Sequence, residues 1–260
     1  MRYDENVPTA KRNKQPPSLK NIFLTPRLPK NDWVLIGLLS VFVVVLAWAL
    51  AVSPKVMLFG TIIDRVETER KVVALTFDDG PLPVHTDETL RLLAQNNVRA
   101  TFFVIGKDAE TYKDELSAVV RAGHALGNHG YSHRALMFAS PARIASEIEM
   151  TDQAIRAAGY EDAIPFRAPY GYKFVALPLY LARHDRPDIS RDVLVDEGSE
   201  RSAEAIATDV VAKVKPGSII LLHPHYDHTA STRAAIPLIV NELRTSGYTF
   251  VTVPELLSLE

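Results

Sequence analysis

Two short segments of the chain carry the side chains that a catalytic divalent metal needs. The first contains adjacent carboxylates at Asp78 and Asp79, and the second contains imidazoles at His129 and His133. One carboxylate and two imidazoles leave coordination positions open for water and substrate. A metal in such a site lowers the pKa of its bound water and polarises a carbonyl, and the other carboxylate is free to accept the proton of that water. The sequence therefore predicts a metal-dependent hydrolytic site.

The local sequence decides whether these side chains can meet. Adjacent residues of a regular strand point to opposite faces, so Asp78 and Asp79 can serve one site only if the chain bends, and Gly80-Pro81 supplies the bend. An Asx turn or a helix cap is the alternative for this pair. The i, i+4 spacing of the histidines suits a helical turn or a tight loop, and Gly130 favours the loop. Two unrelated surface histidines are the alternative there.

The elements that must position these residues alternate along the rest of the chain. Apolar runs predict strands, and the amphipathic stretches between them predict helices, several of which end at a glycine. The seven expected strands are residues 72–77, 101–105, 125–128, 163–166, 192–195, 218–222 and 249–253. The expected helices are residues 87–95, 110–122, 141–158, 175–183, 203–213 and 232–246.

Repeated strand–helix units imply parallel strands joined by right-handed crossovers, and seven in succession predict a closed or nearly closed α/β barrel. The polar candidates stand at the carboxyl ends of the expected strands; they are Asp78, Asp79, His129, Arg167, Asp196 and His223. In barrels of this kind the loops at that end build the active site. We therefore expect these residues to converge on one mouth of the barrel.

Composition limits the class of protein. The chain has 260 residues and is 47% hydrophobic, which is ample for a sizeable core. It has no cysteine, so any metal must be held by His, Asp or Glu. Of its 29 basic and 31 acidic residues, the first 32 positions carry seven and three, which leaves an acidic body behind a basic tail. The body has no basic stretch that could track phosphates, which argues against nucleic acid as its partner.

A long apolar segment precedes the body. Residues 33–52 carry no charge and predict a helix that spans a bilayer, with Trp33 and Trp48 near its two ends. The basic residues before the span place the N-terminus in the cytoplasm. A cleaved signal peptide is the alternative, because Ala47-Trp48-Ala49 has the small-x-small pattern. We favour a single-pass anchor in the inner (cytoplasmic) membrane, with a cytoplasmic tail (1–32), the span (33–52), a connector (53–70) and a periplasmic or extracellular catalytic domain (71–260).

Four short segments make the interpretation more specific. They are Thr76-Phe77-Asp78-Asp79-Gly80-Pro81, His129-Gly130-Tyr131-Ser132-His133, Arg167-Ala168-Pro169-Tyr170 and Leu221-Leu222-His223. In this order they resemble motifs of the polysaccharide deacetylase family, also called NodB-homology or carbohydrate esterase family 4 enzymes. The resemblance covers residues 58–260. It implies a distorted (β/α)7 barrel of parallel strands, in agreement with the strand count, here preceded by one transmembrane helix.

The resemblance also implies roles for the matching residues. Asp79, His129 and His133 would bind the metal, which in the family is usually zinc, and Asp78 would be the general base. Arg167 would pair with Asp78 and keep it ionised, the expected effect of a neighbouring cation on a carboxylate. A surface ion pair is the alternative for this arginine.

The cleavage of an amide also needs groups that hold the oxyanion and protonate the leaving amine. The resemblance gives the first role to the main-chain amide of Tyr170, together with the metal, and the second to His223. Family members carry an Asp near the end of the fifth strand that orients this histidine. Here Asp192, Asp196 or Glu197 could serve, and we favour Asp196. Both tryptophans lie at the expected span, so the sugar groove has no Trp platform.

The sequence therefore predicts a hydrolase that removes N-acetyl groups, or as second choice O-acetyl groups, from an amino-sugar glycan outside the membrane. Its cofactor would be a divalent metal, zinc by resemblance. The anchor suggests an alternative enzyme, a deacylase or deformylase of a lipid-linked sugar at the membrane surface. An alternative from another class is an anchored glycan-binding protein that kept the fold and lost turnover. The sequence determines neither the glycan nor the oligomeric state.

Overall fold

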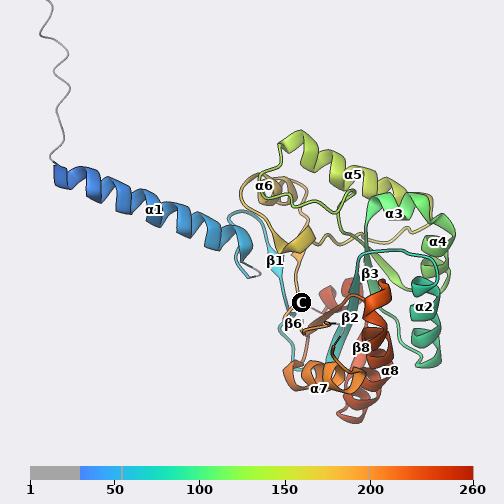
Figure 1. Cartoon of the computed structure of the whole chain (residues 1–260). Helices are drawn as coiled ribbons and strands as arrows, with labels where there is room; N and C mark the ends of the chain where they lie inside the picture. Colours follow the sequence, from blue (N-terminus) through green and yellow to red (C-terminus); the bar gives the residue numbers. More distant parts are fainter. Residues whose placement is uncertain (1–29, 54, 199, 260) are drawn as a thin grey trace, which may run out of the picture. The chain divides into compact units, whose positions relative to one another are not determined.

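The computed structural model describes residues 30–53, 55–198 and 200–259 (Figure 1). The chain divides into two compact units, Met1–Val44 and Val45–Glu260. The expected cytoplasmic tail over residues 1–32 lies almost wholly outside the described residues.

The first described element is helix α1, Lys30–Val52. Its segment Asp32–Val52 has a mean hydropathy of 2.8 and is, within the described part of the chain, the one helix long and apolar enough to cross a membrane. Its apolar residues are exposed; Leu38 and Val44, for example, are 64% and 67% exposed. A signal sequence shares these features. The helix matches the expected span in position and length, and its insertion in a membrane stays a prediction.

The second unit is built around a parallel sheet. Strand β2 (Val72–Asp78) lies at its centre, between β3 (Thr101–Val104) and β7 (Ile219–Leu222). The sheet continues through β4 (Ala125–Asn128) beyond β3 and through β6 (Val193–Leu194) beyond β7, and β8 (Thr249–Val251) pairs with the start of β2. A separate parallel pair joins β1 (Ile62–Ile63) to β5 (Asp188–Ile189).

Phe166 completes the ring. It forms one parallel bridge to Asn128, at the end of β4, and another to Asp188 in β5. Only Ser190-Arg191-Asp192 separates β5 from β6, so one stretch of chain pairs with Phe166 through its first part and with β7 through its last. The expected distorted barrel of parallel strands is therefore confirmed.

The barrel departs from seven regular strands on one side. Residues 163–166, expected as the fourth strand, contribute only the bridge at Phe166, and the strand expected over 192–195 is the two-residue β6. Pro165 has no amide hydrogen to donate to a ladder, which weakens a strand at that position. The two-residue strands β1 and β5 are too short to give an apolar pattern, and the sequence analysis missed both.

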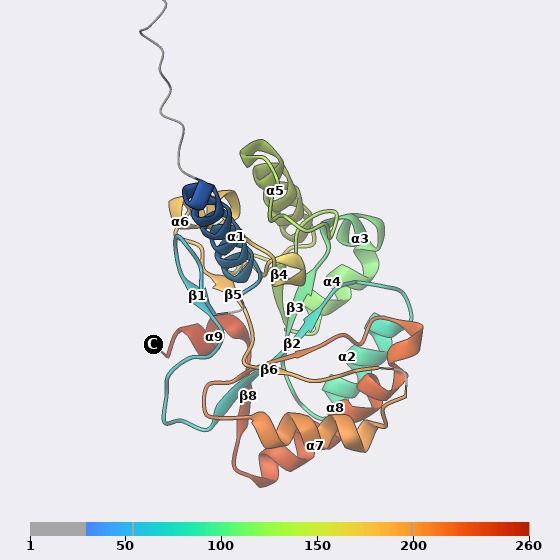
Figure 2. The ribbon, with the colours of Figure 1, turned by 60° about the vertical axis from the view of Figure 1, so that its left-hand side comes forward.

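Helices cover the barrel from outside. Figure 2 shows α2 (His85–Gln95), α7 (Ala203–Lys213) and α8 (Ala230–Thr245) gathered on one side of the sheet. The others in this unit are α3 (Gly106–Thr111), α4 (Lys113–Arg121), α5 (Pro141–Ala157), α6 (Ala176–Arg183) and α9 (Val253–Leu257). The helix expected over 110–122 is two helices, because Tyr112 has non-helical φ and ψ of −114° and 59°. The short α9 was not expected.

The central strand is buried on both faces, as expected for a parallel sheet covered by helices. One face packs in the main core against the helices and carries Val73, Leu75 and Phe77. The other belongs to a second cluster that includes Phe103, and it carries Val72 and Ala74. Because side chains alternate along a strand, Thr76 and Asp78 share this second face. The strand thus delivers Asp78 to the inside of the barrel at its carboxyl end.

Candidate active site

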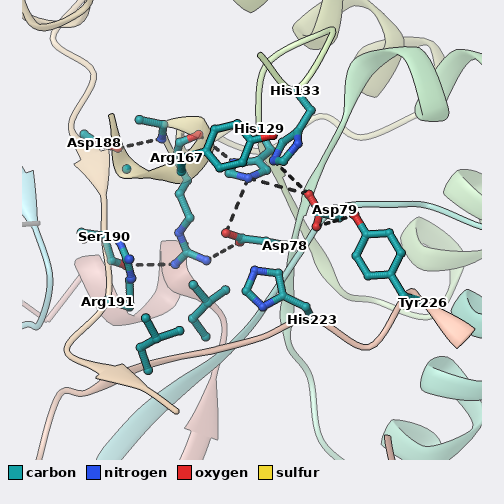
Figure 3. Close-up of a pocket in the computed structure, with 15 residues that line it drawn as sticks. Asp78, Asp79, His129, His133, Arg167, Asp188, Ser190, Arg191, His223 and Tyr226 are labelled. Carbon is teal, nitrogen blue, oxygen red and sulfur yellow. Dashed lines mark hydrogen bonds and ion pairs between the residues drawn. The ribbon is translucent and has the colours of Figure 1, made fainter. Parts of the chain in front are cut away.

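The expected residues converge in one cavity at the carboxyl ends of the strands (Figure 3). The cavity has a volume of about 420 Å³, and its lining includes Asp78, Asp79, His129, His133, Arg167, Tyr170 and His223. These residues come from four segments that lie far apart in the sequence. Asp196 does not line the cavity.

Asp79, His129 and His133 form a cluster suited to a metal. Their ligand atoms all lie within 4.8 Å of one another. Asp79 Oδ1 is 3.2 Å from Nε2 of His133 and 4.0 Å from Nε2 of His129. This oxygen is buried and accepts no hydrogen bond from the described residues. An unsatisfied buried acceptor costs free energy, and a bound cation would satisfy it, so the three residues fit a divalent metal.

The His129 ring is held in the orientation that a metal ligand needs. Its Nδ1 lies 2.9 Å from the carbonyl oxygen of Arg167. A carbonyl oxygen can only accept, so Nδ1 carries the hydrogen and Nε2 keeps its lone pair. That Nε2 lies 3.6 Å from Asp78 Oδ2, on the side of the two carboxylates.

The two histidines lie on a tight loop, as Gly130 predicted. Gly130 and His133 both have positive φ, 74° and 51°. Buried Glu147 of α5 stabilises the loop: its Oε2 accepts hydrogen bonds from the amides of Tyr131 (3.0 Å) and Ser132 (2.7 Å). The sequence analysis missed Glu147. Its signal is an acidic residue between apolar positions on the buried face of a helix.

Three residues of the site have unusual backbone conformations. Among the described non-glycine residues with positive φ are Asp79 (72°), His133 (51°) and Tyr170 (59°). Such a conformation costs roughly 1–3 kcal/mol and persists where surrounding structure imposes it, often at functional sites. The bend expected at Gly80-Pro81 is confirmed, and it begins one residue earlier, at Asp79 itself.

Asp78 forms a buried ion pair with Arg167. Arg167 Nη1 donates to Asp78 Oδ1 at 2.5 Å, and both side chains are about 5% exposed or less. Burial by itself would raise the pKa of Asp78, but the positive charge of Arg167 and its hydrogen bond outweigh burial and hold this pKa below its usual value. The surface ion pair considered for Arg167 is excluded by its burial.

All three nitrogens of the Arg167 guanidinium donate hydrogen bonds. Its other donors bind Thr76 Oγ1 and the carbonyl oxygens of Ile189 and Ser190 at 2.8–3.0 Å. The guanidinium carbon lies 3.9 Å from the ring centroid of Phe103. Phe103 in turn needs Gly127 on the neighbouring strand, because a Cβ there would lie 2.5 Å from the ring. The barrel interior therefore holds the arginine rigidly against Asp78.

His223 is oriented by Glu197, and the expectation that Asp196 fills this role is wrong. Glu197 Oε1 lies 2.8 Å from Nδ1 of His223, and Oε2 accepts from the amide of the same residue at 2.8 Å. Asp196 instead accepts from the amide of Gly198 in a local turn. The sequence favoured Asp196 because it directly follows the strand expected over residues 192–195, but β6 ends earlier, at Leu194.

The Glu197 contact prepares His223 to carry a proton. Burial works to lower the pKa of His223, but the hydrogen bond that it donates to Glu197 and the negative charges of Asp78 and Asp79 raise this pKa above the usual value. A carboxylate only accepts, so Nδ1 is protonated and Nε2 is the atom free to exchange a proton with a substrate.

Tyrosines complete the cavity. The hydroxyl of Tyr226 donates to Asp79 Oδ2 at 2.8 Å, a contact that the sequence did not indicate. Tyr170 lies at the rim, 56% exposed, with its ring centroid 4.7 Å from that of His133 and 5.8 Å from that of Tyr172. These rings offer an aromatic surface where the sequence provides no tryptophan. The oxyanion role of the Tyr170 amide stays a prediction.

Comparison with known proteins agrees with the geometry of the site. A family profile described as polysaccharide deacetylase matches residues 65–184. A peptidoglycan-N-acetylglucosamine deacetylase of Bacillus cereus is 32% identical over 208 residues, which are 76% of this chain and 93% of the relative. The chain belongs to the polysaccharide deacetylase family. This places it among the hydrolases that cleave amide bonds other than peptide bonds.

Solved structures of polysaccharide deacetylases share the fold. One is a peptidoglycan N-acetylglucosamine deacetylase, with a TM-score of 0.71 and 29% identity over 75% of this chain and 92% of the other. Another is a family 4 acetyl xylan esterase of Clostridium thermocellum in complex with a cobalt ion, with a TM-score of 0.67 and 34% identity over 73% and 91%. A bifunctional xylanase/deacetylase of Pseudobutyrivibrio xylanivorans is 34% identical, and this chain spans 31% of its length.

Proposed function

We propose that this polysaccharide deacetylase removes N-acetyl groups from an amino-sugar glycan with a divalent metal held by Asp79, His129 and His133. One observation carries the proposal: the three possible metal ligands share a cavity with Asp78 and His223, each of which is paired with an oppositely charged residue. Asp78 with Arg167 is suited to accept a proton, and His223 with Glu197 is suited to donate one. The metal-bound relative supports the metal, and zinc is our first choice because the ligands are imidazole and carboxylate.

A bound divalent metal would supply Lewis-acid chemistry, which activates water and polarises the acetyl carbonyl. Asp78 accepts the proton of the attacking water on Oδ2, because Arg167 occupies Oδ1. The main-chain amide of Tyr170 donates to the carbonyl oxygen as it gains negative charge. His223 donates from Nε2 to the amine nitrogen as the C–N bond breaks, while Nδ1 stays on Glu197.

The test is acetate release by the full chain in detergent from acetylated chito-oligosaccharides, with and without a chelator. We expect Asp78→Asn to keep its metal content and lose turnover by roughly 100-fold or more, the usual scale for loss of a general base. Asp79→Asn should lose the metal itself, and exposed Asp87→Asn on α2 is the control. Activity that survives both chelation and the loss of Asp79 contradicts the proposed mechanism.

We propose in addition that residues 33–52 anchor the enzyme in the cytoplasmic membrane with the catalytic domain outside. The uncharged helix and the basic residues before it support this topology. The measurement is protease protection: added protease should remove the catalytic domain from intact spheroplasts and leave the tail. Mature protein that begins after Ala49, by N-terminal sequencing, would instead identify a cleaved signal peptide.

One observation favours a substrate close to the membrane, such as a lipid-linked sugar. The amide of Lys173 donates to the carbonyl of Ala51 (2.9 Å) and its ammonium to the carbonyl of Ser53 (3.1 Å). The same ammonium pairs with Asp188 of the cavity wall at 3.2 Å. Ala51 near the end of α1 and Ser53 just after the helix are thus tied to the active-site wall. Acetate or formate release from a polyprenyl-phosphate sugar, compared with a free oligosaccharide, separates the two enzyme functions.

The non-catalytic alternative, a glycan-binding protein, loses its main argument. Loss of the carboxylate near the end of the fifth strand would explain such a loss of turnover, but Glu197 supplies the carboxylate that orients His223. Such a protein would bind acetylated oligosaccharide without releasing acetate, and the assay above detects that outcome.

A further inference from the structure

One wall of the cavity carries a cation without a counter-ion. Arg191 lies in the short segment between β5 and β6 and lines the cavity. The one side-chain hydrogen bond of its guanidinium in the described chain runs from Nη1 to Ser190 Oγ, at 3.5 Å. None of the ion pairs within 4.0 Å among the described residues involves it.

The other charged side chains on this wall form ion pairs. Arg167 is matched by Asp78, and Asp188 is matched by Lys173, whose side chain is 2% exposed like that of Asp188. Figure 3 shows Asp188, Ser190 and Arg191 on the side of Arg167 that faces away from Asp79 and Tyr226. The wall opposite the metal ligands therefore has a surplus of positive charge, and Arg191 is its source.

The guanidinium lies against the rim of the cavity. A Cβ at Gly171 would come within 3.2 Å of Arg191 Nη1, and Gly171 has a φ of +71°, which a larger residue would adopt with strain. Glycine at this position leaves space beside the guanidinium. A substrate that reaches past Tyr170 toward the metal ligands would pass this group.

We infer that Arg191 is a subsite for an oxyanion on the substrate, so that the enzyme acts on an N-acetylated sugar that also carries a carboxylate or a phosphate. The inference rests on the proposed function, which places the acetyl group at Asp79, His129 and His133. A guanidinium presents parallel N–H donors that match both anions. A neutral glycan would leave the arginine without a partner.

The experiment compares sugars that differ in charge, with the full chain in detergent. The substrates are N-acetylglucosamine, N-acetylmuramic acid, its methyl ester and N-acetylglucosamine 1-phosphate; the ester removes the carboxylate charge and little else. The variants are Arg191→Gln and Arg191→Lys. The control is Arg91→Gln, which removes the same charge from an exposed position on α2. Melting temperatures establish that each variant is folded.

We expect Arg191→Gln to lower kcat/KM on an anionic sugar by about 10- to 100-fold, chiefly through KM, because a charge-assisted hydrogen bond is lost. Arg191→Lys should retain part of this preference, since it keeps the charge without the planar fork. Rates on the two neutral sugars should change by no more than about twofold. An effect confined to the carboxylate or to the phosphate sugar identifies which anion the subsite takes.

Equal losses on neutral and anionic sugars would overturn the inference, as would unchanged kinetics on both anionic sugars. If the wild type releases no acetate from any of these four monosaccharides, the proposed function is still judged by the chito-oligosaccharide assay above. Calorimetry then decides the role of Arg191: N-acetylmuramic acid must bind the wild type more tightly than its methyl ester, and Arg191→Gln must abolish the difference. Equal binding of acid and ester to the wild type refutes the subsite.

Discussion

At the scale of single residues, one hydrogen bond identifies Glu197 as the acidic residue that orients His223. Glu197→Gln keeps the size of the side chain and removes the negative charge that raises the pKa of the histidine. The general acid must be protonated, so activity is lost as pH rises through this pKa. In the variant the pKa falls, and the alkaline limb of the kcat profile should move to lower pH while kcat drops about tenfold or more.

The neighbouring residue supplies the control for this prediction. Asp196→Asn removes the same charge one position earlier, from a side chain that contacts Gly198 and not the histidine. Its pH profile should match that of the wild type. If Asp196→Asn shifts the profile and Glu197→Gln does not, the assignment of Glu197 is wrong.

The hydrogen bond from the Tyr226 hydroxyl to Asp79 should affect metal affinity. It holds one oxygen of Asp79 at 2.8 Å while the other faces the histidines. Partners of this kind orient a ligand, and their loss commonly weakens metal binding 10- to 100-fold. We therefore expect Tyr226→Phe to raise the Kd for zinc by about that factor, measured by competition with a chromophoric chelator. Tyr172→Phe, beside Tyr170 and outside the cavity lining, should bind zinc as the wild type does.

At the scale of elements, helix α5 supports the histidine loop. Glu147 receives two loop amides and the hydroxyl of Ser132. Glu147→Gln removes the negative charge and replaces one of the two acceptor oxygens by an NH2 donor, so the loop should loosen and the Kd for zinc rise about tenfold. Exposed Glu149 on the same helix is the matched control. Wild-type zinc affinity in Glu147→Gln would show that the loop holds its shape without this brace.

The broken strand is the other element that shapes the site. Because β5 and β6 are interrupted at Ser190-Arg191-Asp192, the Ser190 carbonyl is free to accept from Arg167. A continuous ladder would engage that carbonyl in pairing with a neighbouring strand. The same interruption turns Arg191 toward the cavity. The irregular side of the barrel thus supplies the positions on which the inferred anion subsite depends.

At the scale of the whole molecule, a buried histidine predicts how stability depends on pH. Burial lowers the pKa of His124 to about 4, with a smaller effect from the nearby charge of Arg99. Its Nδ1 accepts from the amide of Ala100 and must be unprotonated to do so. The unfolded chain has a histidine pKa of about 6.5, so it binds more protons between pH 6.5 and 4, and stability falls as pH decreases through this window.

We expect His124 to account for about 2 kcal/mol of the free energy of unfolding lost between pH 7 and pH 5. His124→Asn, which can keep the acceptor, should lose that much less over the same range in urea unfolding of the full chain in detergent. Exposed His184→Asn should show the wild-type dependence. An unchanged pH dependence in His124→Asn would mean that this ring is protonated in the folded protein at pH 5.

Much of the fold and site could be predicted from local features of the sequence. The apolar runs of β2, β3 and β7 mark buried parallel strands, because such strands are apolar on both faces. Polar residues directly after them lie at one end of the barrel, since parallel strands share a direction. Asp79, His129 and His133 were therefore expected together, and the structure brings them within 4.8 Å.

The tertiary structure alone decided the contacts made by irregular segments. The choice of Glu197 over Asp196, the brace from Glu147 and the hydroxyl of Tyr226 on Asp79 all depend on how loops turn after a strand has ended. Periodicity fixes side-chain direction only inside regular elements, and strands of two residues leave no period to detect. The sequence by itself determined which chemistry the chain carries, and packing in three dimensions determined which neighbours tune it.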